Sequence, residues 1–382
     1  MIFDYAQNGM QKKLALLFNA FWINRAGMSG GDRRLLEIFK RIGSRFELTV
    51  YTSEDGRRIA DPYLPGARFI VNSISGSLYS AYVQRALWAT RLIQRDSYDV
   101  VYASSDFFPD VLPCHAARKR NAHTKWFQCI FHLYPPWFTR PGNLLRNLAG
   151  TIAQQFSLLH IKKADGIITL NSQVRDQLNK LGFGNRIIVN PCGVDPAYCF
   201  PSKSGKQAHQ CCFLGRLAPS KGIFDLVEIW RSVAADIPDA KLKIVGGGTD
   251  ELMAQLQNRI IAKGLSSSIE VCGFLPEKEA FDVVRSSGVF LFPSHEEGFG
   301  MVIAEAMACG VPVIAWNLPV YRDVFPKALL LATPGDIEGF SSRLIGLIKT
   351  PALAEELARK GSDIVDRYNW DTIAEKEFEL IR

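Results

Sequence analysis

The stretch that decides the fold is PSHEEGFGMVIAEAMACGVPVIA, from Pro293 to Ala315. It follows a short apolar run at residues 289–292 that predicts a buried strand. Two glycines then interrupt the strand pattern, and residues 301–308 have the pattern of a helix that a Gly-Val-Pro sequence ends. A strand, a glycine-rich turn and a helix in this order form one step of a parallel α/β sheet.

This turn places two carboxylates near the beginning of a helix. Glu297 falls on the loop, eight residues before Glu305, which falls inside the helix. A helix that starts after a glycine-rich turn presents unpaired N–H groups and the positive end of its dipole, here at Gly300 and Met301. The segment therefore predicts a site for a charged ligand such as a phosphate.

Short apolar strands alternate with helical patterns along the chain, which is the rhythm of a doubly wound parallel sheet. A cluster of Pro, Gly and Ser at residues 190–206 interrupts this rhythm and marks a linker. A length of 382 residues is enough for two domains with separate cores. Strands are expected at residues 14–20, 46–51, 100–103, 126–131, 166–170, 211–214, 242–245, 269–271, 289–292 and 313–315.

Four segments together resemble the retaining glycosyltransferases of family 4. They are the Glu297-to-Glu305 stretch with EAMACGVPVIA, GRLAPSKG from residue 215, KIVGGG from residue 243, and SGGDRRLLEIF from residue 29. The resemblance covers nearly the whole chain, and it implies the GT-B architecture of two Rossmann-like domains that face a central cleft. We expect an N-terminal acceptor-binding domain at 1–195, a C-terminal donor-binding domain at 196–365, and a last helix at 366–382 that packs back on the first domain.

The resemblance also implies roles for single residues. Arg216 and Lys221 would neutralise the diphosphate leaving group of a nucleotide-sugar donor without a metal. Glu305 would accept hydrogen bonds from ribose hydroxyls, and Glu297 would hold the sugar and stabilise positive charge at the opening anomeric bond. The other predicted site residues are His132 near the donor sugar, Gly30 and Gly31 across the cleft, and Gly300, Met301, Gly246 and Phe274 on the donor side.

Charge is distributed unevenly along the chain. Residues 1–190 hold 25 Lys and Arg against 13 Asp and Glu, whereas the remaining residues hold 20 against 25. A basic N-terminal half predicts an anionic partner there, either a phosphorylated or lipid-linked acceptor or an anionic membrane surface. No basic run with interleaved aromatic residues matches a nucleic-acid reader, so nucleic acid is not expected.

Two segments combine apolar and basic residues as a membrane-surface helix does. They are residues 77–95 and residues 137–148, the second with Arg140 and Arg146. A packed helix whose arginines extend to water is the simpler interpretation. No apolar run reaches the length of a spanning helix, and KKLALLFNAFWI at residues 12–23 is interpreted as a buried strand rather than a signal peptide. We therefore expect a cytoplasmic protein, with peripheral contact at the inner face of the membrane as an alternative.

The eight cysteines include no C-x-x-C pair and have no histidine spaced to complete a zinc site. We expect buried free thiols, no metal, and no cofactor besides the nucleotide sugar. The predicted function is transfer of a hexose, with retention, from a nucleotide-diphosphate sugar to a hydroxyl acceptor. Three alternatives stay open at this point: a nucleotide-sugar epimerase, a glycoside hydrolase, and an inactive subunit that binds nucleotide.

Overall fold

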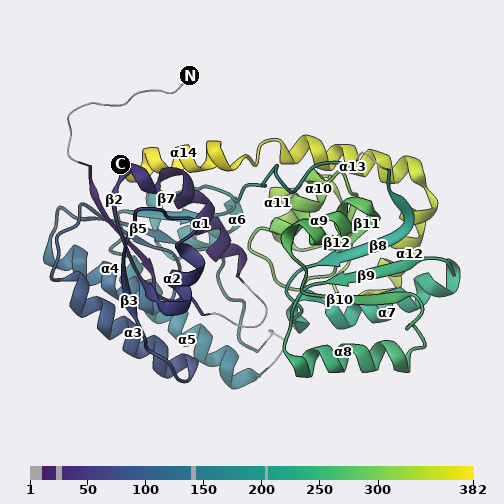
Figure 1. Ribbon diagram of the computed structural model, residues 1–382, viewed down its shortest axis with the longest axis horizontal. Coiled ribbons are helices and arrows are strands. Elements are labelled where there is room, and N and C mark those ends of the chain that lie inside the picture. Colours follow the sequence, from purple (N-terminus) through teal and green to yellow (C-terminus); the bar gives the residue numbers. More distant parts are fainter. Residues whose placement is uncertain (1–10, 23–27, 139–142, 203–204) are drawn as a thin grey trace.

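The computed structural model describes residues 11–22, 28–138, 143–202 and 205–382. These residues form two parallel sheets, each with helices on both faces (Figure 1). The first sheet has the order β3-β2-β1-β4-β5-β6-β7, and the second has the order β10-β9-β8-β11-β12-β13. The strands of the first sheet are β1 (Lys13–Phe18), β2 (Glu47–Ser53), β3 (Arg68–Asn72), β4 (Val100–Ala103), β5 (Lys125–Cys129), β6 (Gly166–Thr169) and β7 (Ile187–Val189). Those of the second are β8 (Gln207–Leu214), β9 (Lys241–Val245), β10 (Ile269–Gly273), β11 (Ser287–Phe292), β12 (Val313–Trp316) and β13 (Leu329–Ala332).

Helices connect successive strands of each sheet. In the first half they are α1 (Gly30–Ile42), α2 (Glu54–Ala60), α3 (Leu78–Ile93), α4 (Phe108–Arg120), α5 (Leu144–Ile161) and α6 (Ser172–Lys180). In the second half they are α7 (Ile223–Asp236), α8 (Asp250–Ala262), α9 (Glu277–Ser286), α10 (Met301–Ala308), α11 (Pro319–Val324), α12 (Ile337–Lys349) and α13 (Pro351–Val365), followed by α14 (Trp370–Ile381). Three short 3-10 helices are η1 (Gly43–Arg45), η2 (Gly184–Arg186) and η3 (Pro219–Lys221).

The expected doubly wound α/β fold is confirmed, and every strand predicted from the sequence is present. Three strands were missed, and all three lie at sheet edges: β3, β7 and β13. In both sheets the strand order reverses at the first strand of that half, β1 or β8. Open α/β sheets bind ligands outside the carboxyl ends of the strands at such a reversal. The fold therefore directs attention to the loops after β1 and β8.

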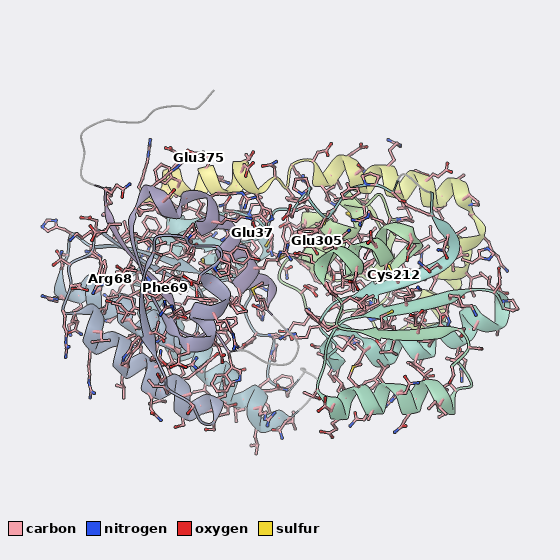
Figure 2. All side chains as sticks on the ribbon, viewed as in Figure 1. Glu37, Arg68, Phe69, Cys212, Glu305 and Glu375 are labelled. Carbon is pink, nitrogen blue, oxygen red and sulfur yellow. The ribbon has the colours of Figure 1, made fainter. Side chains whose placement is uncertain are left out.

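Helix α14 returns from the second half and packs on α1 of the first (Figure 1). A buried ion pair between Arg34 of α1 and Glu377 of α14 fixes this contact, and both side chains are 0% exposed. Tyr102 of β4 and Asn190 after β7 also donate to the Glu377 carboxylate. At the helix surface, Glu375 is exposed (Figure 2) and pairs with Arg45. The buried network ties the last helix to the first sheet.

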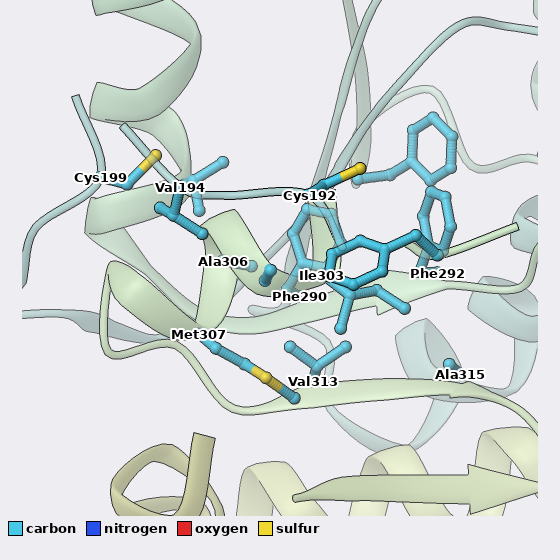
Figure 3. Close-up of a cluster of buried hydrophobic side chains, with 14 of the residues drawn as sticks. Cys192, Val194, Cys199, Phe290, Phe292, Ile303, Ala306, Met307, Val313 and Ala315 are labelled. Carbon is cyan, nitrogen blue, oxygen red and sulfur yellow. The ribbon is translucent and has the colours of Figure 1, made fainter. Parts of the chain in front are cut away.

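The linker between the halves packs into the core of the second half. Cys192, Val194 and Cys199 lie beside side chains of α10 and of the strands that flank it (Figure 3). The chain passes between the halves twice, near residue 194 and near residue 369. The backbone N–H of Val194 donates to the carbonyl of Tyr368 at 2.8 Å, so the two crossing segments are hydrogen-bonded to each other. The predicted boundary at residue 195 falls in this paired segment.

The expected packing of residues 77–95 is wrong in one respect. We expected the apolar residues of this helix to pack inward and its arginines to reach water. In α3, Leu78 and Leu87 are exposed, whereas Arg85 is buried at 5% exposure. The Arg85 guanidinium donates to the carbonyl of Phe21 at 2.7 Å and thereby holds the loop after β1. Of the second segment, Arg140 lies outside the described residues.

Candidate active site

Lys221 and Glu297 form an ion pair between the loop after β8 and the loop after β11. Their side chains are 18% and 11% exposed, and Glu297 also accepts a hydrogen bond from the Ser294 hydroxyl at 3.1 Å. Gly222 has a φ of +71°, and a Cβ on it would lie 1.9 Å from the Pro293 carbonyl oxygen. Only glycine allows the two loops to approach this closely, so it sets the distance between cation and carboxylate.

Helix α10 begins directly after these loops. Its N-cap is Gly300, whose φ of +94° is in the left-handed region. A Cβ there would contact Tyr321 and Phe325 at 3.2 and 3.3 Å, so the turn is closely packed as well as left-handed. Among the described residues no side chain caps this helix, so the N–H groups around Met301 are available to a ligand.

Glu305 lies one turn into α10 and is 6% exposed. Within the described residues, neither of its carboxylate oxygens has a hydrogen-bond partner. Burial raises the pKa of Glu305, while the charge of Arg33 from α1 of the other half lowers it. Arg33 itself pairs with Glu277 at the start of α9. A buried carboxylate with open acceptor positions, close to a fixed cation, is suited to bind ligand hydroxyls.

The first turn of α1 faces the second half across the site (Figure 2 shows Glu305 at this boundary). Ser29 and Asp32 form a capping box that starts α1 at Gly30. A Cβ on Gly30 would lie 3.2 Å from the Met301 sulfur, and one on Gly31 would lie 2.7 Å from the Phe131 ring. Gly30 therefore lets α1 approach the start of α10 in the second half, whereas Gly31 lets α1 approach the end of β5 in its own half.

His132 follows β5 of the first half. It contacts the loop between β11 and α10 of the second half, residues 293–300, which carries Glu296 and Glu297 and which we term the glutamate loop. Its Nε2 lies 3.3 Å from Glu296 Oε1, and its ring packs on Tyr134 with centroids 5.2 Å apart. Gln154 of α5 donates to the His132 carbonyl at 3.2 Å and to the Asp106 carboxylate at 2.7 Å. Burial raises the pKa of Asp106. His132 therefore lies close to two carboxylates, that of Glu296 from the second half and that of Asp106 from the first half.

Further contacts hold the glutamate loop against the first half. The Asn171 side-chain amide donates to the Gly298 carbonyl at 2.6 Å. Ser172, the next residue, donates from its backbone and its hydroxyl to Asp323 of α11 at 2.7 and 2.9 Å. Glu297, Glu305, Lys221, Gly30 and His132 are brought together by these contacts.

The remaining predicted residues lie at the margin of this group. Arg216 follows β8 and is exposed. Burial raises the pKa of Asp32 in α1, and hydrogen bonds from Ser29 and the charge of Arg216 offset part of this effect. A cavity of about 550 Å³ is lined by Arg216, Ser220, Gly248 and Thr249 among others, but not by Glu297 or Glu305. The cavity therefore lies beside Arg216 and the start of α8, and not at the two glutamates.

Gly246 and Phe274 lie at the ends of β9 and β10. Gly246 has a φ of +146°, and a Cβ on it would lie 1.8 Å from the Gly215 carbonyl oxygen. It therefore lets the ends of β8 and β9 approach closely. Phe274 is 72% exposed and is held by no ring contact in the described part of the chain. Its assignment to the nucleotide site stays a prediction.

The sequence did not single out four charged residues of this site. Arg33, Glu277, Glu296 and Asp106 come from four different loops or helix starts, and only the packing of the halves brings them together. Glu296 directly precedes the predicted Glu297 in the sequence. The one available signal was position, because Arg33 and Asp106 follow expected strands β1 and β4 in the usual ligand-binding region.

Two family models match the chain. The model described as "Glycosyl transferases group 1" matches residues 198–363, and the one described as "Glycosyltransferase Family 4" matches residues 28–198. The chain belongs to the family 4 glycosyltransferases. The predicted family is confirmed, and the two models together cover both halves of the chain.

Named relatives in this family include two mannosyltransferases. The chain is 32% identical over 206 residues to a phosphatidyl-myo-inositol mannosyltransferase of Mycobacterium leprae, covering 52% of this chain and 54% of that one. It is 27% identical over 303 residues to O-antigen chain mannosyltransferase B of Escherichia coli, covering 75% and 74%. The chain thus spans about half the length of the first of these relatives.

Solved structures share the arrangement of the two sheets. Sucrose-phosphate synthase from Thermosynechococcus elongatus superposes with a TM-score of 0.81 at 18% identity, over 97% of this chain and 98% of that one. Anabaena HepE in complex with UDP and glucose gives a TM-score of 0.74 at 18% identity, over 97% and 99%. These likenesses show the GT-B fold.

Within the described residues, the acidic, cysteine and histidine side chains form no cluster of three or more that could hold a metal ion. All eight cysteines are free thiols, and all but Cys272 are buried. In the same part of the chain, no helix has the length and apolar character needed to cross a membrane.

Proposed function

We propose that this family 4 member is a retaining, metal-independent glycosyltransferase that uses a nucleoside-diphosphate hexose as donor. The observation that carries the proposal is the group formed by Lys221, Glu297 and Glu305 beside the uncapped start of α10. One cation and a set of free N–H groups suit a diphosphate, and a buried carboxylate with open acceptor positions suits a ribose.

Lys221 has two roles in this proposal. Without donor it neutralises Glu297, which would otherwise be a poorly solvated carboxylate. A bound diphosphate would share the ammonium group and stabilise the leaving group as the bond to the sugar opens. Glu297 would then face the sugar, where its negative charge stabilises the positive charge that develops at the anomeric carbon.

His132 and the first turn of α1 would contact the bound donor from the first half. The His132 imidazole, held through Gln154 and paired with Glu296, is placed to donate to a sugar hydroxyl or to a developing oxyanion. Gly30 and Gly31 would allow the donor phosphates to approach the backbone. No further carboxylate on this side is assigned as a covalent nucleophile.

The acceptor would enter from the first half, beyond His132. The names of the relatives mention phosphatidyl-myo-inositol and an O-antigen chain, which supports a hydroxyl on a lipid-linked or polymeric acceptor. Mannose is the sugar named for both relatives, and HepE was solved with UDP and glucose. We therefore propose a GDP- or UDP-activated hexose.

The alternatives are less well supported. A glycoside hydrolase needs two carboxylates at the sugar but no phosphate cation, whereas here Lys221 is built into the site. A nucleotide-sugar epimerase needs no acceptor region, and the family relatives are transferases. An inactive subunit would not need Glu297 to be held by both Ser294 and Lys221.

The test is slow transfer to water, which requires no acceptor. The protein is incubated with GDP-mannose or UDP-glucose in excess EDTA. NMR identifies which anomer of the free sugar appears first, before mutarotation, and measures the nucleoside diphosphate that is released. The proposal expects release of diphosphate in EDTA, with the donor's anomeric configuration in the freed sugar. Release of the opposite anomer, a strict requirement for a divalent metal, or a changed sugar that remains on the nucleotide would contradict it.

A further inference from the structure

Exposed apolar side chains gather on one face of the first half. Among the described residues, sixteen large apolar side chains are exposed, and twelve of them fall within residues 78–159. These twelve define what we term the α3/α5 surface: Leu78, Tyr79, Val83, Leu87, Phe107, Trp137, Phe138, Leu144, Leu145, Ile152, Phe156 and Leu159. Single exposed apolar residues are ordinary, but a concentration of them on neighbouring helices is typical of an interaction surface.

Helix α5 exposes an apolar stripe while it buries several polar side chains. It buries Leu158 and Ile161 near its C-terminus, but also the polar Asn147, Gln154 and Ser157. Its outer stripe consists of Leu145, Ile152, Phe156 and Leu159, which are 77%, 61%, 44% and 67% exposed. At 100° per residue these four positions fall within about 60° of one another around the helix. A helix that exposes its apolar stripe to water gains nothing from it unless something covers it.

Helix α3 extends the same surface. Tyr79, Val83 and Leu87 follow one another at intervals of four residues and are 51% to 53% exposed. Helix α4 packs against both α3 and α5, so the three helices form one layer. In Figure 1 this layer lies along the lower side of the first half, opposite α14. The two apolar stripes therefore belong to a single face.

The rim of this face is basic. Helix α5 contains Arg146 and no acidic residue. Because α3, α4 and α5 all connect parallel strands, their C-terminal ends lie at the same edge, where exposed basic residues gather. These are Arg91, Arg95, Lys119, Arg120, Lys162 and Lys163. An apolar centre with a basic edge is complementary to lipid tails beneath anionic headgroups.

We infer that the α3/α5 surface docks on an anionic lipid bilayer. The apolar stripe of α5 would enter the headgroup region, and the lysines and arginines at the helix ends would meet the headgroup phosphates. Two residues of this surface, Trp137 and Phe138, lie five and six residues after His132 in the chain, so the segment that follows His132 belongs to both the candidate site and the surface. That a docked enzyme would take its acceptor from the membrane rests on the proposed function; the docking itself does not.

The test is flotation of the full chain with phosphatidylcholine vesicles, with and without 30 mol% phosphatidylglycerol. The salt concentration is about 50 mM, because exposed charges are screened less at low ionic strength. The test variant is Ile152→Glu with Leu159→Glu, which changes two exposed positions of the stripe. The matched control is Ala352→Glu with Thr372→Glu, which adds the same charge at exposed positions of α13 and α14 on the opposite side (Figure 1). Thermal melting confirms that all three proteins are folded.

The inference expects wild type and control to float with anionic vesicles, at least tenfold weaker flotation of the α5 variant, and little flotation with phosphatidylcholine alone. Absence of wild-type flotation with anionic vesicles would overturn it. Equal flotation of the α5 variant and wild type would also overturn it. If ultracentrifugation shows a wild-type dimer that the α5 variant dissociates, and vesicles capture neither, then a second copy of the chain covers this surface instead. None of these outcomes depends on nucleotide binding or turnover.

Discussion

The buried Arg34–Glu377 pair allows a quantitative prediction about how α14 is held. In Glu377→Gln the side chain keeps its shape but loses its charge, which leaves the Arg34 guanidinium in a site where both side chains are 0% exposed. Breaking one partner of a buried ion pair costs about 3–5 kcal/mol. Arg34 keeps its hydrogen bonds to the carbonyls of Asn190 and Pro191 at 3.1 Å, so we expect the lower end, about 3 kcal/mol. For a domain of this size that corresponds to a fall in Tm of roughly 6–12 °C.

The control lies two residues earlier on the same helix. Glu375 pairs with Arg45 at the surface, where the side chains are 50% and 42% exposed, so Glu375→Gln should cost less than about 1 kcal/mol. Scanning calorimetry and urea unfolding of both variants measure the difference. If the free energies of unfolding of Glu377→Gln and Glu375→Gln differ by less than about 1 kcal/mol, the Arg34 charge is not left unpaired in a buried site and the prediction is refuted. A double variant, Arg34→Met with Glu377→Leu, should recover part of the loss because no charge is then left buried, although Tyr102 and Asn190 lose an acceptor.

Three further predictions concern the site and its supports. Glu305→Gln should weaken nucleoside-diphosphate binding about tenfold by calorimetry without lowering Tm, because burial already disfavours the carboxylate; a large loss of stability would argue for a structural role. Burial raises the pKa of Asp110 to about 7, so this carboxyl binds a proton in the native state but not in the unfolded state between about pH 4 and 7; its contribution to stability should fall by at most about 4 kcal/mol as pH rises through that window. Urea unfolding of wild type and Asp110→Asn across that window should therefore show a pH-dependent difference, and parallel curves would refute it. Gly222→Ala should destabilise by more than about 1 kcal/mol because its Cβ would meet the Pro293 carbonyl, whereas Gly346→Ala, with open space in α12, should be neutral or stabilising; equal melting temperatures would contradict this.

The central strands and the α10 motif could be predicted because their signals are local. Strands such as β1 and β12 are buried along nearly their whole length, so their sequences are continuous apolar runs. Helix α10 begins and ends at the residues that its glycines indicate. The edge strands β3 and β7 are only partly buried and short, so their patterns resemble loops.

Other features depend on packing between distant segments. Arg33 acts on Glu305 only because α1 meets α9 and α10, and no spacing in the sequence encodes that contact. The orientation of α5 could not be predicted from apolar periodicity, since Asn147 and Gln154 are satisfied inside while leucines remain outside. Leu158 and Ile161 of this helix face the core, whereas Leu145, Ile152 and Leu159 do not.

The central claim is that Lys221, paired with Glu297 in the absence of ligand, binds the diphosphate of a nucleotide sugar. Calorimetric titration with UDP, GDP and ADP, on wild type, Lys221→Ala and the surface control Lys349→Ala, tests it most directly. We expect one nucleotide to bind wild type and the control equally, and to bind Lys221→Ala at least tenfold more weakly. If no nucleotide binds the folded wild-type protein, or if Lys221→Ala binds as wild type does, the donor site is not the one described.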